Sequence, residues 1–241
     1  LDRASQCALL AARQAWEQAG APQVAPQRLA VSVSPGMGPV LSVMKAWDTL
    51  REKGPRRVLP TAVPALMPNA PAAAVGIELG AHGGIHAPVS ACASGAEAIA
   101  YGADLISLGR ADVVVAGGTD AALHPMTVAA FGAMRALSTR NADPQTASRP
   151  FAPDRDGFVL GEGAGLLVLE RAAHAKARGA RILAVLAGSG VTADAYDVAR
   201  PEPSGAQQER ALRLALERAG IAPGAVGHVN AHATSTPAGD V

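Results

Sequence analysis

The segment Asp112-Val113-Val114-Val115-Ala116, which is continuously apolar from Val113 onward, most restricts the folds that this chain can adopt. A strand with one face in water alternates polar and apolar residues, whereas a continuously apolar run is typical of a strand covered on both faces. Gly117-Gly118 is expected to end the strand. A helical pattern over about Ser94–Leu108 precedes it, and a short extended segment, His86–Ser90, precedes the helix. Strand, helix and strand in this order predict a parallel βαβ unit and an α/β fold.

Cys92 lies at the turn between the first of these strands and the helix. Its neighbours Ala91, Ala93 and Gly95 are small, so a substrate carbonyl can approach the sulfur closely. The amides and the positive dipole end of the following helix favour a thiolate over a thiol. Such a thiolate is a nucleophile for acyl transfer, and the amides can hold the oxyanion that forms. The alternative is a small buried cysteine that packs a tight turn.

Composition excludes several classes of protein. Lys+Arg number 21 against 20 Asp+Glu in 241 residues, so no overall charge favours nucleic acid or an anionic membrane. No apolar run approaches the ~18 residues that a membrane span needs. The two cysteines, Cys7 and Cys92, form no disulfide or metal-binding pattern, which is typical of a reducing cytoplasm.

Periodicity predicts the remaining elements. Helices are expected at Ser5–Ala19, Val40–Lys53, Ala70–Gly80, Ala172–Arg178 and Gln207–Ala219. Strands are expected at Leu29–Val33, Ala164–Glu170, Ile182–Ala187 and Gly227–Ala231.

One of the six histidines stands apart. His232 follows the predicted strand Gly227–Ala231 and precedes small hydroxyl residues and a proline turn. Active-site groups of open α/β folds collect at the carboxyl ends of strands, so His232 is a candidate partner for Cys92. A loop histidine with no chemical role is the alternative. The other five are expected to be structural or solvated.

Four motifs together resemble the β-ketoacyl-[acyl-carrier-protein] synthases. They are Val89–Gly95 around Cys92, Asn230–Asp240 around His232, Asp154–Gly165 (DRDGFVLGEGAG), and Met67-Pro68-Asn69. The resemblance spans essentially the whole chain, and the 140 residues between Cys92 and His232 fit it. The elongating synthase of bacterial type II fatty acid synthesis is the most similar type, and relatives in polyketide and mycolic acid pathways share the motifs.

The resemblance implies a thiolase-like α/β fold with layers in the order αβαβα. Residues 1–170 would form the N-terminal half with the nucleophile, and residues 171–241 would begin the C-terminal half with His232. It also implies a cytoplasmic homodimer without metal or free cofactor, whose substrates are carried on the phosphopantetheine of acyl carrier protein.

The implied reaction is a decarboxylative Claisen condensation. Cys92 would hold the acyl group as a thioester, and His232 would stabilise the enolate that forms when malonyl-carrier protein loses CO2. Thr234 and Thr236 match positions that contact the pantetheine arm, and Met37 and Phe131 match positions that line the acyl pocket. Glu162, between two glycines, is expected to be structural support.

The chain departs from the family's pattern at both ends. It stops before a second histidine, a lysine and a C-terminal phenylalanine turn, and it starts inside a helix without the family's first strand. We therefore expect part of a longer enzyme; the alternative is a true fragment, inactive and prone to aggregate.

Other functions remain open for the same fold. They are a polyketide or specialised-lipid ketosynthase, a thiolase acting on coenzyme A esters, and a non-catalytic partner subunit that sets chain length. Retention of Cys92 and His232 argues against the last. Arg56 and Arg57 are candidates for docking an acidic carrier protein, with a solvated loop as the alternative.

Overall fold

The computed structural model describes residues 1–240; Val241 lies outside the described residues. The chain forms two compact units. The first consists of Leu1–His124 and Gly161–Ala184, and the second of Pro125–Leu160 and the residues from Val185 onward.

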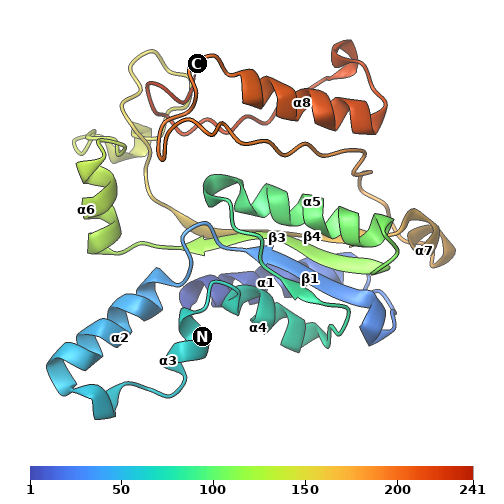
Figure 1. Cartoon of the computed structure of the whole chain (residues 1–241), viewed down its shortest axis with the longest axis horizontal. Helices are drawn as coiled ribbons and strands as arrows, with labels where there is room; N and C mark the ends of the chain where they lie inside the picture. Colours follow the sequence, from blue (N-terminus) through green and yellow to red (C-terminus); the bar gives the residue numbers. More distant parts are fainter. Residues whose placement is uncertain (241) are drawn as a thin grey trace. The chain divides into compact units, whose positions relative to one another are not determined.

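A four-stranded sheet organises the first unit (Figure 1). Its strands are β1 (Leu29–Ser34), β2 (Ile85–His86), β3 (Val113–Ala121) and β4 (Glu162–Glu170). They lie in the order β2-β1-β3-β4; β1 runs parallel to both β2 and β3, and β4 runs antiparallel to β3. The predicted parallel βαβ arrangement is confirmed, with β1 lying between its two strands.

Helices cover both faces of this sheet (Figure 1). Helices α1 (Arg3–Gln18) and α4 (Ala70–Leu79) pack on one face, where Val113 and Val115 join the larger core cluster. Helix α5 (Ser94–Ser107) packs on the other face, against Val114 and Ala116. The continuous apolar run is therefore buried from both sides, as its composition predicts.

Three other helices follow the sequence pattern closely: α2 (Val40–Lys53) and α7 (Ala172–Ala177) in the first unit, and α8 (Ala206–Ala219) in the second. The sequence pattern did not predict α3 (Ala62–Leu66) in the first unit or α6 (Pro125–Ala133) in the second. Short 3-10 turns occupy Pro26–Arg28, Pro55–Arg57, Ala91–Ala93, Pro144–Thr146 and Pro223–Ala225. Among the described residues 1–240, no helix is long and apolar enough to cross a membrane.

Two predicted strands are wrong. Residues 182–187 and 227–231 have no regular structure and pair with no strand among residues 1–240. Val185 is 81% exposed and Val229 63% exposed. An apolar, β-branched segment has the propensity for a strand, but it becomes one only when a neighbouring strand satisfies its amides and carbonyls.

The ends of β3 and β2 differ most from the predicted boundaries. Gly117 and Gly118 do not end β3, which continues to Ala121. Gly117 has a φ of +151°, and a Cβ there would lie 2.1 Å from the Gly165 carbonyl oxygen, so glycine permits a close approach within the strand. The extended segment before Cys92 also ends early, since β2 stops at His86 and Pro88 has no amide to donate.

Candidate active site

Cys92 lies in the 3-10 turn Ala91–Ala93, directly before the first residue of α5. The turn is held by Ser94, whose hydroxyl accepts a hydrogen bond from the Ser90 amide (2.9 Å) and donates one to the Ala91 carbonyl (2.7 Å). No side chain caps the N-terminus of α5. The cysteine is exposed and unbonded, so its sulfur is accessible beside the uncapped helix end.

The residue before the nucleophile is strained. Ala91 has a φ of +48°, in the left-handed region that alanine rarely occupies. Strained backbone of this kind persists only where the surroundings hold it, and it clusters at functional sites. What holds Ala91 therefore also determines how Cys92 is presented.

A glycine contact brings the start of α5 onto the sheet. A Cβ on Gly95 would lie 3.2 Å from the Cα of Gly118, and one on Gly118 would lie 2.9 Å from the Cα of Gly95. Only two residues without side chains allow this approach. Gly118 is thus part of the support for the Cys92 turn.

A cavity of about 260 Å³ opens beside Cys92. It is lined mainly by small residues: Ser34, Gly36, Ala91, Cys92, Ser94, Gly95, Gly118, Thr119, Asp120, Gly163, Ala164 and Gly165. Cys92 and Asp120 are its two titratable groups. Met37 lies next to this lining, in the turn that follows β1.

Asp120 is a site residue that the sequence reading missed. Its half-buried carboxylate accepts hydrogen bonds from the amides of Gly36 (2.9 Å) and Met37 (3.3 Å). Burial raises the pKa of Asp120, although these two amides pull it down. An acid near the end of an otherwise apolar strand was the available signal.

Glu162, which the sequence predicts to be structural support, lies on the edge strand of the sheet. Its side chain, at the start of β4, forms an ion pair with Arg3 of α1. The pair joins the edge of the sheet to the helix that covers it.

Three predicted site residues of the second unit, His232, Thr234 and Thr236, lie on one loop. His232 is exposed, and Thr234 and Thr236 are half-buried, with 3.0 Å between their hydroxyl oxygens. Thr236 also accepts a hydrogen bond from the Gly239 amide (3.2 Å).

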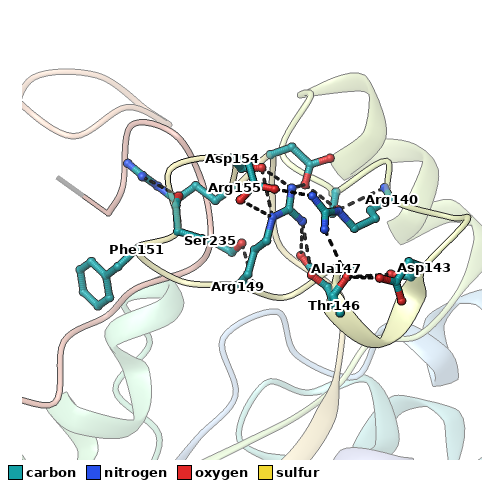
Figure 2. Close-up of polar contacts among 12 residues, drawn as sticks. Arg140, Asp143, Thr146, Ala147, Arg149, Phe151, Asp154, Arg155 and Ser235 are labelled. Atoms are coloured by element: carbon teal, nitrogen blue, oxygen red, sulfur yellow. Dashed lines mark hydrogen bonds and ion pairs between the residues drawn. The ribbon is translucent and has the colours of Figure 1, made fainter.

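Ser235 anchors this loop through every polar group it has (Figure 2). Its amide donates to Asp240 (3.0 Å), its carbonyl accepts from the Gly157 amide (2.8 Å), and its hydroxyl accepts from the Arg149 amide (3.1 Å). Its φ is +66°, a further strained backbone held by its contacts. Asp240 also accepts from the Phe151 amide (3.0 Å).

The Asp154-Arg155-Asp156-Gly157 motif supplies partners of that loop. The guanidinium of Arg155 donates to the carbonyls of Thr236 (3.0 Å) and Pro237 (2.8 Å). Arg149 pairs with Asp154 (3.3 Å) and Asp156 (3.1 Å). Two motifs that are about 80 residues apart in sequence therefore form one hydrogen-bonded assembly.

Asp156 has the largest pKa change in this assembly. The Ser138 hydroxyl (2.7 Å) and the Thr139 amide (2.9 Å) donate to its carboxylate. These hydrogen bonds lower the pKa of Asp156 from 3.8 to about 2.

Phe131 lies on α6 and packs against Phe158. The two rings meet edge-on, with 5.1 Å between centroids and 80° between planes. Of the predicted site residues, Cys92 and Met37 therefore belong to the first unit, and Phe131, His232, Thr234 and Thr236 to the second.

A metal site does not emerge from the described part of the chain. Within residues 1–240, no group of three or more His, Cys, Asp or Glu side chains is placed to hold an ion.

Comparison with known proteins defines the class. Residues 1–175 match the Beta-ketoacyl synthase, N-terminal domain, and residues 183–241 match the Beta-ketoacyl synthase, C-terminal domain. The fold is the thiolase-like α/β fold of ketosynthases. The chain belongs to the β-ketoacyl synthase family.

Relatives named 3-oxoacyl-[acyl-carrier-protein] synthase 2 match almost the whole chain. The Mycobacterium bovis protein is 47% identical over 230 residues, which cover 95% of this chain and 55% of that protein. A Staphylococcus aureus protein is 44% identical over 243 residues, which cover 100% of this chain and 60% of that protein. The chain thus spans between 55% and 60% of the length of these relatives.

Solved structures of ketosynthases match the fold. A β-ketoacyl synthase from Burkholderia phymatum has a TM-score of 0.90 at 38% identity, covering 99% of this chain and 59% of that one. A type II polyketide ketosynthase, solved in complex with its acyl-carrier protein and bound to a hexaketide, has a TM-score of 0.89 at 32% identity, covering 99% and 60%.

Proposed function

We propose that the protein carrying this chain is a β-ketoacyl-[acyl-carrier-protein] synthase that extends acyl chains by two carbons in fatty acid biosynthesis. The observation that carries the proposal is Cys92, exposed at the uncapped N-terminus of α5 in a member of this family. The 47% identity to a 3-oxoacyl-[acyl-carrier-protein] synthase 2 supports the fatty acid assignment.

The first step is acyl transfer to Cys92. The thiolate attacks the carbonyl of an acyl thioester on acyl carrier protein, and the carrier's pantetheine thiol leaves. The amides at the start of α5 stabilise the oxyanion of the tetrahedral intermediate. The product is an acyl thioester on Cys92.

The second step is decarboxylative condensation. Malonyl-carrier protein loses CO2, and His232 donates a hydrogen bond to the thioester oxygen of the enolate that forms. The enolate carbon attacks the acyl carbonyl on Cys92; a carbon–carbon bond forms, the bond to sulfur breaks, and the thiolate is regenerated. No free cofactor takes part.

The remaining predicted residues bind substrate in this proposal. Thr234 and Thr236 contact the pantetheine arm, and Met37 and Phe131 line the acyl pocket. Arg56 and Arg57, exposed on the turn after α2, are candidates for docking the acidic carrier protein. The protein acts as a cytoplasmic homodimer, with residues 1–170 and 171–241 belonging to its N- and C-terminal thiolase-like halves.

A polyketide ketosynthase is the second candidate. The observation that favours it is the match to the type II polyketide ketosynthase at a TM-score of 0.89. The chemistry at Cys92 and His232 is the same in both candidates; the substrate differs. A fatty acid synthase extends a saturated acyl chain, whereas a polyketide synthase extends a poly-β-keto chain.

Intact mass spectrometry tests the proposal. Incubation of the purified full-length protein with acyl-carrier protein should raise its mass by one acyl group, and Cys92→Ala should show no increase. His232→Ala should still accept the acyl group but should release little CO2 from malonyl-carrier protein. An unmodified wild-type protein, or an adduct that persists in Cys92→Ala, would contradict the proposal.

A further inference from the structure

The carboxylate of Asp120 is the one acidic group that lines the Cys92 cavity, and the proposed chemistry does not use it. Within residues 1–240, no ion pair neutralises it. A half-buried carboxylate without a cationic partner costs folding free energy, so its retention in a catalytic cavity points to a role there. Its carboxylate accepts hydrogen bonds from the amides of Gly36 and Met37.

Gly36 lies between Asp120 and the backbone that precedes the nucleophile. A Cβ at Gly36 would lie 2.7 Å from Oδ2 of Asp120 and 3.0 Å from the carbonyl oxygen of Ala91. The carboxylate holds the Gly36–Met37 turn through the two amides, and it faces the Ala91 carbonyl across the position that a Gly36 side chain would occupy. Asp120, Gly36 and Ala91 therefore form a continuous line of contact that ends at the residue before Cys92.

The strain at Ala91 explains why such a line of contact matters. A left-handed alanine relaxes to an ordinary φ unless its neighbours prevent it. Ser94 holds the Ala91 carbonyl through one hydrogen bond, and Gly36 lies so close to the same carbonyl that a Cβ there would be 3.0 Å from its oxygen. Movement of that turn would give Ala91 room to relax and would reorient Cys92 against the end of α5.

We propose that Asp120 is a positioning residue for the nucleophile: by holding the Gly36–Met37 turn against Ala91, it fixes the strained backbone that presents Cys92 to the N-terminus of α5. The same hydrogen bonds fix the backbone of Met37, which the proposed function places in the acyl pocket. The inference deepens the proposed function and rests on it for the role of Cys92.

Two substitutions at Asp120 separate its charge from its hydrogen bonds. Asp120→Asn removes the charge but keeps an acceptor oxygen for the two amides, because Oδ2 alone lies within reach of both. Asp120→Ala removes the charge and the acceptor. Any difference between these two variants therefore reports on the anchoring of the turn.

Glycine variants disturb the same contact from the other side. Gly36→Ala places a methyl group between Asp120 and Ala91, and its φ is compatible with alanine. Gly224→Ala is the matched control, because its Cβ would meet nothing within 4 Å and its φ is also ordinary.

The readout is the rate of iodoacetamide alkylation of Cys92 against pH in the full-length protein, with Cys7 as an internal reference for unfolding. In Asp120→Ala the rate near neutral pH should be about tenfold lower than in Asp120→Asn, because Cys92 is no longer held against the N-terminus of α5. Gly36→Ala should also lower the rate of Cys92 alkylation, and Gly224→Ala should leave this rate unchanged.

Equal alkylation profiles for Asp120→Ala and Asp120→Asn would overturn the proposal. If faster Cys7 labelling shows that Asp120→Ala unfolds, the test rests on Gly36→Ala. An unchanged alkylation profile of Cys92 in Gly36→Ala would then overturn the proposal. Alkylation requires no acyl carrier protein, so it tests Asp120 even if the wild-type protein fails to accept an acyl group. Such a failure would count against the proposed function alone.

Discussion

At the scale of single residues, the Cys92 turn depends on places where a side chain is absent. Gly95 and Gly118 touch backbone to backbone, and Gly36 is enclosed by Asp120 and Ala91. A cysteine at a helix N-terminus is reactive only if the helix is held in place, and these contacts hold it. The glycines are therefore as much a part of the candidate site as the polar groups.

Gly118→Ala should destabilise the protein more than Gly165→Ala, its partner in the β3–β4 register. The added methyl at Gly118 meets the Cα of Gly95 at 2.9 Å, and backbone cannot rotate away, so we expect a loss of about 1–3 kcal/mol. A methyl at Gly165 meets nothing within 4 Å. Urea unfolding of the two variants measures the difference, and equal losses would contradict the contact.

At the scale of elements, α1 is tied to α2 through a single buried side chain. Asp2 caps α1 by accepting a hydrogen bond from the Ala4 amide (3.0 Å). Its other oxygen accepts from the amide (3.1 Å) and hydroxyl (2.7 Å) of Ser42 in α2. Asp2 is only 3% exposed, so water cannot replace these partners.

Asp2→Ala should lower the free energy of unfolding by about 2–3 kcal/mol, the sum of a lost helix cap and the groups left unpaired at Ser42. Asp2→Asn keeps an oxygen for the cap and should lose less. Urea unfolding monitored by circular dichroism measures both. If the alanine variant were as stable as the asparagine variant, the cap would not hold α1.

At the scale of the whole molecule, stability should depend on pH through Asp156. Its pKa is lowered to about 2 in the folded chain, against an ordinary value of 3.8. The native state therefore binds the proton more weakly than the unfolded state. The resulting stabilisation is complete above about pH 4 and is lost as pH falls toward about 2.

Asp156→Asn should remove this share of the acid sensitivity. The fall in urea midpoint between about pH 5 and about pH 2.5 should be smaller in the variant than in the wild type, because the other carboxylates titrate equally in both. Arg155 and Arg149 retain their contacts with the Thr236 carbonyl and Asp154 in this variant. Identical losses on acidification would show that the folded chain does not stabilise the Asp156 carboxylate.

The sequence by itself determined the features that depend on neighbouring residues. The buried strand at Val113–Ala116, the helix behind Cys92 and the end of β4 at Glu170 follow from local apolar patterns and turns. The family's motifs are also continuous stretches of sequence, so the family resemblance could be recognised without a structure. The matches to both β-ketoacyl synthase domains confirm it.

Tertiary structure alone decided what depends on distant partners. The segments 182–187 and 227–231 were predicted to be strands, but they pair with no strand among residues 1–240. Gly117 and Gly118 lie within β3, where the Gly165 carbonyl oxygen occupies the space that a Gly117 side chain would need. The Asp120 carboxylate accepts from the amide of Gly36, which lies 84 residues away in the sequence, so no local pattern links the two residues. Propensity acts within a few residues, whereas strand pairing, close backbone contact and burial of a charge are set by segments that meet only in the folded chain.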